Sequence, residues 1–558
     1  MKKRTTGIIF TIIAALVLIG MIYYVTLPPI SIYSGEFWSF CLLIDGVIFV
    51  SYYIIGILSG KIFAETVRMP SGHIDFKTSM NGKKSKWVKV QIILTLAAAA
   101  FVFAGSLVGS EIFRAKTYSS VITVNERDFA ETIAETEYVS DIALMDTASA
   151  RIIGARTLGT LSDLVSQYEV SNSYTQIAVR DAGGNAHPYK VSPLEYASFF
   201  KWLTNASSGI PGYVKVDTVE FDAEFVRLEG DYIKYSPSAY FGKDLLRALR
   251  FAYPTKIFGS VCFEVDDEGH PYWVASTMKP NAGLFGAMDV DTVIILDACT
   301  GETVEYAPAE SPDWIDIVYY GDLICQKYDW YGMYSGGYIN SMFSQTGCVV
   351  TTDDFGYKII GNDVYIFTGV TSTSGDKANI GFILANSRTG EYHYFAVPGA
   401  EEHSAMSAAE GSVQQYRYTA SFPSLINVDG EATYIMVLKD ASGIVKMYSM
   451  VNMENYNIVV TSETQEEAFQ KYKSALRQDS TKGSSSELIT EEITVSEILY
   501  ITSGGETTVY IKTPSGIYSM AFDEAVLFIE EGDTAEVTYS YKSENGVTQI
   551  TKITKITK

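Results

Sequence analysis

The sequence contains few of the side chains that most often bind metals or act as nucleophiles. Its 558 residues include five cysteines and five histidines, and their spacing matches no zinc or other metal motif. We therefore expect no metal and no cofactor. Four cysteines follow the apolar N-terminal region: Cys262, Cys299, Cys325 and Cys348. They allow at most two disulfides, of which Cys262–Cys299 is attractive if both lie on neighbouring strands, but small core residues are an equally good interpretation.

Common motifs of hydrolases and transferases are also missing. The sequence has no G-x-S-x-G elbow, no H-E-x-x-H helix and no Walker loop. His403 and Ser404 are a base and a nucleophile by type, but adjacent side chains point apart, and a helix cap explains Ser404 better. A non-enzymatic function is therefore preferred. The alternative is an envelope hydrolase or transferase with an unfamiliar site near Asp376, His393 and His403.

Basic residues are scarce after the first 109 positions. Residues 1–109 contain ten Lys/Arg and four Asp/Glu, a net charge of +6, so residues 110–558 carry −29 in a chain whose total is −23. Like charges repel, and such an acidic region argues against nucleic acid as a direct ligand.

Three apolar runs stand apart, at residues 7–27, 37–60 and 90–110. Each approaches the ~20 residues that cross about 30 Å of hydrocarbon, so we predict three transmembrane helices within residues 1–110. Lys2, Lys3 and Arg4 precede the first run, and the loop at 61–89 is also basic, whereas residues 28–36 have no Lys or Arg. The positive-inside rule then predicts a cell-membrane protein with a cytoplasmic N-terminus and extracytoplasmic residues 111–558.

Asp45 is the one ionisable residue within a predicted span. Ion or proton handling is one interpretation of an intramembrane carboxylate. We prefer the other, in which Asp45 hydrogen-bonds to Tyr23, Tyr24 or Ser106 and holds the helices together.

An α+β ectodomain is predicted after the spans, with a first unit at 111–235 and a repeat region at 236–476. Apolar residues at helical spacing predict helices over 148–167, over 192–202 beginning at Ser192-Pro193, and over 236–254, where Phe241, Leu245 and Leu249 share a face. Short strands joined by Asp/Asn-Gly turns predict hairpins between them.

One hairpin sequence pattern recurs along the repeat region. VIILDACTGE, at 293–302, aligns with FILANSRTGE, at 382–391, so that Asn386 matches Asp297 and Gly390 matches Gly301. Related turns occur at Asp181–Gly184 and Asp440–Gly443. The helix SPSAYFGKDLLRALRFAYP, the strand pair FEVDDEGHPYWVAS and this hairpin together resemble PepSY-like domains, and the whole chain resembles a group of uncharacterised Gram-positive multi-pass envelope proteins. The resemblance implies repeated α+β modules and a partner that is an envelope protein such as a peptidase.

An aromatic insert at 308–356 interrupts that pattern. Exposed rings there provide a ligand surface for sugar or peptide groups, whereas buried rings only fill a core, which is the commoner case. The candidate ligand-binding rings are Trp314, Trp330, Tyr331, Tyr334 and Tyr338.

The C-terminal region begins with a capping box, Ser462-Glu-Thr-Gln465, that predicts a helix to about Leu476. A polar linker at 477–487 and a small OB- or SH3-like β-barrel at 488–558 follow. The pattern of three spans, repeated modules and missing catalytic motifs favours a membrane-anchored binding, scaffold or regulatory protein of the cell envelope. Its expected partners are the membrane and an envelope protein or cell-wall component, and not nucleic acid.

Overall fold

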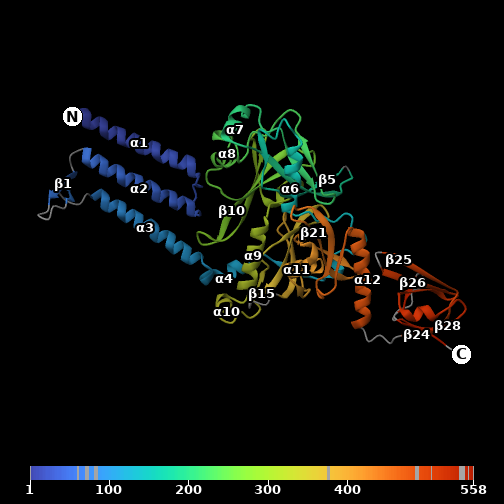
Figure 1. The fold of residues 1–558 in the computed structure, drawn as a ribbon. Coiled ribbons are helices and arrows are strands. Elements are labelled where there is room, and N and C mark those ends of the chain that lie inside the picture. Colours follow the sequence, from blue (N-terminus) through green and yellow to red (C-terminus); the bar gives the residue numbers. More distant parts are fainter. Residues whose placement is uncertain are drawn as a thin grey trace. The chain divides into compact units, whose positions relative to one another are not determined.

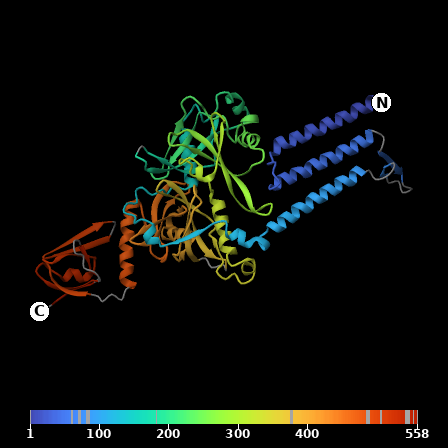
Figure 2. The ribbon, with the colours of Figure 1, turned by 180° about the vertical axis from the view of Figure 1, so that it is seen from behind.

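The computed structural model describes residues 2–58, 62–68, 74–80, 86–181, 183–373, 378–483, 489–503, 506–539, 547–550 and 552–556. The chain divides into two compact units, Met1–Phe469 and Gln470–Lys558. Figures 1 and 2 follow the chain from the N-terminal helices, in blue, through the green, yellow and orange sheets.

Three N-terminal helices lie where the spans were predicted: α1 (Lys2–Thr26), α2 (Gly35–Leu58) and α3 (Lys86–Gly109). All three are long and apolar enough to cross a membrane. Strands β1 (Ile62–Arg68) and β2 (Ile74–Met80) form an antiparallel hairpin between α2 and α3. Helix α4 (Glu111–Ser119) starts directly after α3 and leads into a sheet-rich domain.

Four antiparallel meanders, each of four strands consecutive in sequence, form this domain. We number them repeats 1 to 4. Repeat 1 contains β5 (Thr175–Arg180), β6 (Ala186–Tyr196), β7 (Gly212–Asp217) and β8 (Asp222–Arg227), and repeat 2 contains β9 (Ile257–Val265), β10 (Pro271–Ala282), β11 (Gly286–Asp297) and β12 (Thr303–Tyr306). Repeat 3 contains β14 (Gly356–Ile360), β15 (Asp363–Ser372), β16 (Ala378–Asn386) and β17 (Tyr392–Phe395), and repeat 4 contains β20 (Ser424–Val428), β21 (Glu431–Lys439), β22 (Val445–Asn452) and β23 (Val459–Ser462).

Short strands extend these sheets. Strand β4 (Tyr168–Val170) pairs with β6, while β13 (Val349–Thr351) and β18 (Gly399–Ala400) join repeat 3 and β19 (Thr419–Ala420) joins repeat 4. Strand β3 (Val124–Arg127), which follows α4, pairs in parallel with β17. The segment after the third span is therefore built into repeat 3 before the chain reaches repeat 1.

Two of the hydrophobic cores in the described residues are each shared by two meanders. Repeats 1 and 2 share one core with α6 (Thr147–Gly159), α7 (Phe199–Asn205) and α8 (Leu245–Ala252), and its members include Val214, Leu249 and Trp273. Repeats 3 and 4 share a second core with α11 (Glu402–Ser412), and the members of this core include Phe382 and Tyr434. Burial of apolar area at about 25 cal/mol per Å² makes these shared cores the main stabilising contribution.

Several predicted helices differ from the structure. The helix predicted over 192–202 starts too early, because β6 runs to Tyr196 and Pro193 pairs with Tyr213 of β7. Pro193 therefore lies in a strand, and the helix in this region is α7, which begins at Phe199. The helix predicted over 148–167 ends at Gly159. Helix α8 starts at Leu245 because the Asp244 side chain accepts the Arg247 N–H, and Phe241 is 58% exposed and off the predicted face.

The second unit has one small core between two sheets. Strands β24 (Ile489–Thr494), β28 (Thr534–Tyr539) and β30 (Lys552–Lys555) form one sheet, and β25 (Glu497–Ser503), β26 (Glu506–Thr513), β27 (Gly516–Ala521) and β29 (Val547–Gln549) form the other. Val509, Tyr518 and Val537 are buried between them. Helix α12 (Gln465–Gly483) begins at the end of the first unit and continues into the second, ahead of these strands. Residues 477–483, predicted as linker, are therefore helical, and Thr464 caps the helix by accepting the Glu467 N–H.

Candidate functional site

Asp297, the polar residue at the end of β11, caps a tight turn. Its Oδ1 accepts the N–H groups of Cys299 (2.8 Å) and Thr300 (2.9 Å), and Gly301 closes the turn at φ +84°. Asn386 does the same at the end of β16, where its Oδ1 accepts the N–H groups two and three residues later. The predicted equivalence of Asp297 and Asn386 is confirmed as a structural cap.

Asp181 and Asp440 cap a different kind of turn. Their Oδ1 atoms accept the N–H groups two and four residues later, as Asp266 does between β9 and β10. The turns at Asp181, Asp266 and Asp440 therefore share one hydrogen-bond pattern. They resemble the Asp297 turn, as predicted, only in that an Asx side chain accepts backbone N–H groups.

A side-chain pair recurs at the same place in all four repeats. The second strand pairs with the third so that Tyr189, Tyr272, Tyr365 and Thr433 face Asp217, Asp297, Asn386 and Asn452. In each repeat, the residue two positions before this second-strand residue forms a side-chain hydrogen bond with the third-strand residue. These four bonds, which we call the cap pairs, are His187–Asp217 (2.8 Å), His270–Asp297 (3.1 Å), Asp363–Asn386 (2.8 Å) and Glu431–Asn452 (3.4 Å).

The residue types of the cap pairs differ between repeats, but each pair keeps its side-chain hydrogen bond. In repeats 1 and 2 a histidine bonds to an aspartate, and this histidine lies in the second strand (His187) or directly before it (His270). In repeats 3 and 4 a carboxylate on the second strand accepts from an asparagine amide. The other atom of each third-strand side chain caps the following turn, so each pair ties a hairpin turn to the neighbouring strand. A pairing preserved through such exchanges indicates a structural function.

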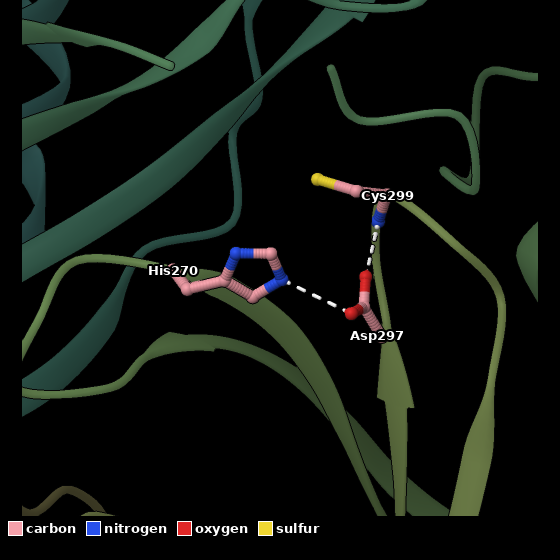
Figure 3. A group of neighbouring side chains, drawn as sticks. All are labelled: His270, Asp297 and Cys299. Atoms are coloured by element: carbon pink, nitrogen blue, oxygen red, sulfur yellow. Dashed lines mark hydrogen bonds and ion pairs between the residues drawn. The ribbon is translucent and has the colours of Figure 1, made fainter. Parts of the chain in front are cut away.

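Repeat 2 alone adds a thiol to its cap pair. Cys299 occupies the position held by Val219, Arg388 and Glu454 in the other repeats, and the ligand atoms of His270, Asp297 and Cys299 all lie within 4.8 Å of one another (Figure 3). Histidine, thiolate and carboxylate together are the donor set of an open zinc-type site.

The state of the thiol favours a structural interpretation of this cluster. Cys299 is buried, and its Sγ donates to the carbonyl of Asp231 (3.2 Å). Burial, with Asp297 and Asp231 nearby, raises the pKa of Cys299 to about 12, so the protonated form, which is a poor ligand, dominates. His270 and Asp297 already form the cap pair of their repeat. We therefore interpret the cluster as a capped turn with a buried thiol beside it.

The sequence contains a signal for these pairs that the search for catalytic motifs missed. The tripeptide His-Pro-Tyr occurs at His187 and again at His270, each time at the start of a second strand. Dispersed histidines carry no catalytic signal, but a repeated tripeptide indicates equivalent positions in a repeated unit.

A buried acid pair lies where repeats 1, 2 and 3 meet. Glu264 of β9 is fully buried and accepts the N–H groups of Asp316 (2.9 Å) and Ile317 (3.2 Å), while Asp316 accepts the Ala178 N–H of β5 (2.8 Å). Burial raises the pKa of Glu264 to about 7, and burial together with Glu264 raises the pKa of Asp316. Neither carboxyl is accessible to a substrate, so the pair joins repeats and does not offer a reaction centre.

The five candidate rings lie in several clusters. Trp314 stacks on Tyr272 of repeat 2 (4.8 Å between ring centroids). On α9 (Gly321–Tyr334), Tyr331 packs against the core of repeat 3. Trp330 and Tyr334 contact Tyr118 of α4, and Tyr334 stacks on Tyr338 of α10 (Tyr338–Met342). The ligand surface stays a prediction. Of the five candidate rings, Trp330, Tyr334 and Tyr338 lie together, on the side of α9 that faces α4 and α10.

Asp45 joins two spans, through partners that differ from the predicted ones. Its Oδ1 accepts from Gln91 Nε2 and its Oδ2 from Thr95 Oγ1, both at 2.8 Å and both from α3. Both carboxylate oxygens are thus satisfied within the helix bundle. Tyr23, Tyr24 and Ser106 were wrong as partners. The two tyrosines lie on α1, and Ser106 lies on α3 but about 16 Å beyond Thr95 at 1.5 Å per residue.

All five cysteines are free. Cys262 lies on β9 opposite Val274 of β10, and β10 separates β9 from β11, after which Cys299 follows. The two cysteines are therefore not on neighbouring strands.

The residues of the alternative enzyme hypothesis lie on separate elements. His393, on β17, pairs with Glu391 (3.5 Å), whereas His403 is exposed on α11. Asp376 lies outside the described residues. Ser404 is inside α11 and does not cap it, because the helix begins at Glu402.

Comparisons with known proteins give no family. No protein-family model matches the sequence, and no curated protein matches it. Among solved structures, a levansucrase mutant from B. megaterium is 9% identical over 77% of this chain and 98% of its own, with a TM-score of 0.19. An α-L-arabinanase mutant from Cellvibrio cellulosa is 9% identical over 60% of this chain and 85% of its own, with a TM-score of 0.15. Likenesses this weak carry no argument about fold or function.

Proposed function

We propose that this chain is a non-enzymatic binding or scaffold protein of the cell envelope, which presents its four-repeat domain at a fixed position above the membrane. Within this proposal the repeats are PepSY-like modules and the second unit is an OB-like barrel. The observation that carries it is that the domain packs on the ends of the spans at two separate places.

The first contact joins the connection between α1 and α2 to helix α8. The buried Arg250 donates from Nε to the Leu27 carbonyl (2.9 Å), and the Ile30 N–H donates to the Pro254 carbonyl (2.6 Å). The Arg247 guanidinium lies 4.2 Å from the ring centre of Tyr24. The connection and the domain therefore share one side of the membrane, which is the outer side if the basic residues at 61–89 are cytoplasmic.

The second contact joins α3 to the tip of the β10–β11 hairpin. A Cβ on Gly109 would lie 2.7 Å from the Ala282 carbonyl oxygen, and one on Gly105 would overlap Leu284. Tyr118 of α4 also donates to the Gly109 carbonyl (3.0 Å). Glycines spaced by four on α3 thus provide the close approach that this hairpin needs.

A fixed mount suits a protein that holds a partner at a set height. The histidines and carboxylates of the cap pairs stabilise hairpin turns. This structural role supports a binding function over a catalytic one. The partner in this proposal is an envelope protein such as a peptidase, or a cell-wall component.

Crosslinking of the intact membrane protein, followed by affinity purification, tests the proposal. We expect a stoichiometric envelope partner that depends on residues 111–469. The matched control is a chain with the three spans alone, which should capture none of it. Recovery of the same proteins by both chains, or of none by either, would contradict the binding function.

A further inference from the structure

Large apolar side chains are exposed on a few elements of the domain. Of the described residues in 111–469, four of the five most exposed large apolar side chains lie on or next to α4, α7 and α10: Phe343 (84%), Ile339 (75%), Phe200 (74%) and Phe113 (64%). We define the apolar patch as Ile112 and Phe113 of α4 together with Ile339 and Met342 of α10 and Phe343, which directly follows α10. All five are more than half exposed.

This apolar patch adjoins the end of the third span. Helix α4 begins at Glu111, two residues after α3 ends at Gly109, so Ile112 and Phe113 follow the span by about 5 Å along the chain axis at 1.5 Å per residue. Helix α10 packs against α4, and Tyr334 links the two by contacting both Tyr118 and Tyr338. Figures 1 and 2 both show α10 beside α4 at the end of α3.

The local composition is that of a membrane interface. Residues 330–352 contain no Lys, Arg, Asp or Glu, although charged residues make up 19% of the chain. The segment has Trp330, Tyr331, Tyr334 and Tyr338 instead, and such rings are enriched where hydrocarbon meets the headgroups.

A second group of exposed apolar side chains lies near the ends of the first two spans. Phe251 of α8, 55% exposed, contacts Tyr23 and Tyr24 in the last turns of α1. Leu246 on the same helix is 52% exposed. The domain thus presents apolar side chains beside both places where it meets the spans.

We infer that the apolar patch lies in the headgroup–acyl boundary of the bilayer that α1, α2 and α3 span. The occupant is lipid, because the patch is continuous along the chain with the end of α3 and its α10 side lies in the charge-free segment 330–352, and apolar area at that depth is removed from water. The exposed Arg114 and Lys116, beside Phe113 on α4, are basic side chains that suit the level of the headgroups. The domain then rests on the membrane and does not stand clear of it. This inference requires only that the helices span the membrane, and it does not depend on a binding partner.

Depth-dependent fluorescence quenching tests this arrangement on the full chain in phosphatidylcholine nanodiscs. An environment-sensitive fluorophore is attached at Phe343→Cys, with Tyr416→Cys as the matched control, because Tyr416 is also exposed (56%) and lies outside the patch. The unsubstituted chain gives the background labelling of the native cysteines. Ile339→Cys is the second patch position if Phe343→Cys does not fold.

The expected result is a blue-shifted emission at position 343. Lipids with a shallow doxyl group should quench this emission at least about twofold more strongly than the emission at position 416. Equal, weak quenching at both positions would overturn the inference. A probe at 343 that is shielded from aqueous iodide but not quenched by the doxyl lipids would also overturn it, because that result indicates a second protein chain over the patch.

Discussion

Burial raises the pKa of the Glu264 carboxyl, although the N–H groups of Asp316 and Ile317 donate to it and by themselves lower that pKa. Its pKa of about 7 lies above the ordinary value of 4.5. The folded state therefore binds a proton on Glu264 more tightly than the unfolded state, and the stability that it gives is present below pH 4.5 and is lost as the pH rises through about 7.

We expect Glu264→Gln to weaken this pH dependence. From pH 5 to pH 8 the variant should gain stability relative to the unsubstituted chain, by at most about 3 kcal/mol, since one pKa unit corresponds to about 1.4 kcal/mol. Thermal unfolding in detergent at both pH values measures the change. Glu229→Gln is the control, because Glu229 is exposed; an equal response from both variants would contradict the assignment.

The cap pairs predict matched costs in different repeats. His187→Ala and His270→Ala each remove one side-chain bond to the aspartate that caps the following turn. Each should lower the free energy of unfolding by about 1 kcal/mol. His403→Ala, at an exposed position on α11, should leave stability unchanged. Chemical denaturation compares the three variants, and a loss confined to His270→Ala would mean that the cluster with Cys299 has its own function.

Helix α3 and the β10–β11 hairpin depend on a close approach at Gly109. A side chain there meets the hairpin backbone, and backbone atoms cannot rotate away as a long side chain can. Gly109→Val should therefore cost about 1–3 kcal/mol and loosen the hairpin from the span.

The same substitution in α1 provides the control for this prediction. A Cβ on Gly20 would meet no atom within 4 Å, so Gly20→Val places an equal change at a position of a span where the added side chain has open space. Thermal unfolding and protease sensitivity in detergent separate the two variants. If both lose stability equally, the cost comes from the membrane helices and not from the hairpin.

Some elements were predictable from the sequence because local patterns determine them. The three spans follow from apolar length, and the Asp297 and Asn386 turns follow from side chains that must cap tight turns. The helix start predicted at Ser192-Pro193 failed because tertiary pairing with β7 outweighs a local Pro signal.

Other features depend on contacts between distant segments. The Glu264–Asp316 junction joins residues about fifty positions apart in sequence, and the cap pairs depend on strand register, which no local pattern states. The repeated His-Pro-Tyr tripeptide was available in the sequence, but two of the four repeats replace it by Asp-Val-Tyr and Glu-Ala-Thr. Only the register identifies those segments as equivalent.

Membrane orientation sets which compartment the four-repeat domain meets. The contact of Arg250 with Leu27 requires the first connection and the domain to share a side, and the basic residues at 61–89 predict that this side is outside. In intact cells, a membrane-impermeant maleimide should therefore label Tyr416→Cys on the domain. It should label Ser79→Cys, on β2 between the second and third spans, only after the cells are opened. Labelling of Ser79→Cys alone in intact cells would reverse the orientation and make the domain cytoplasmic.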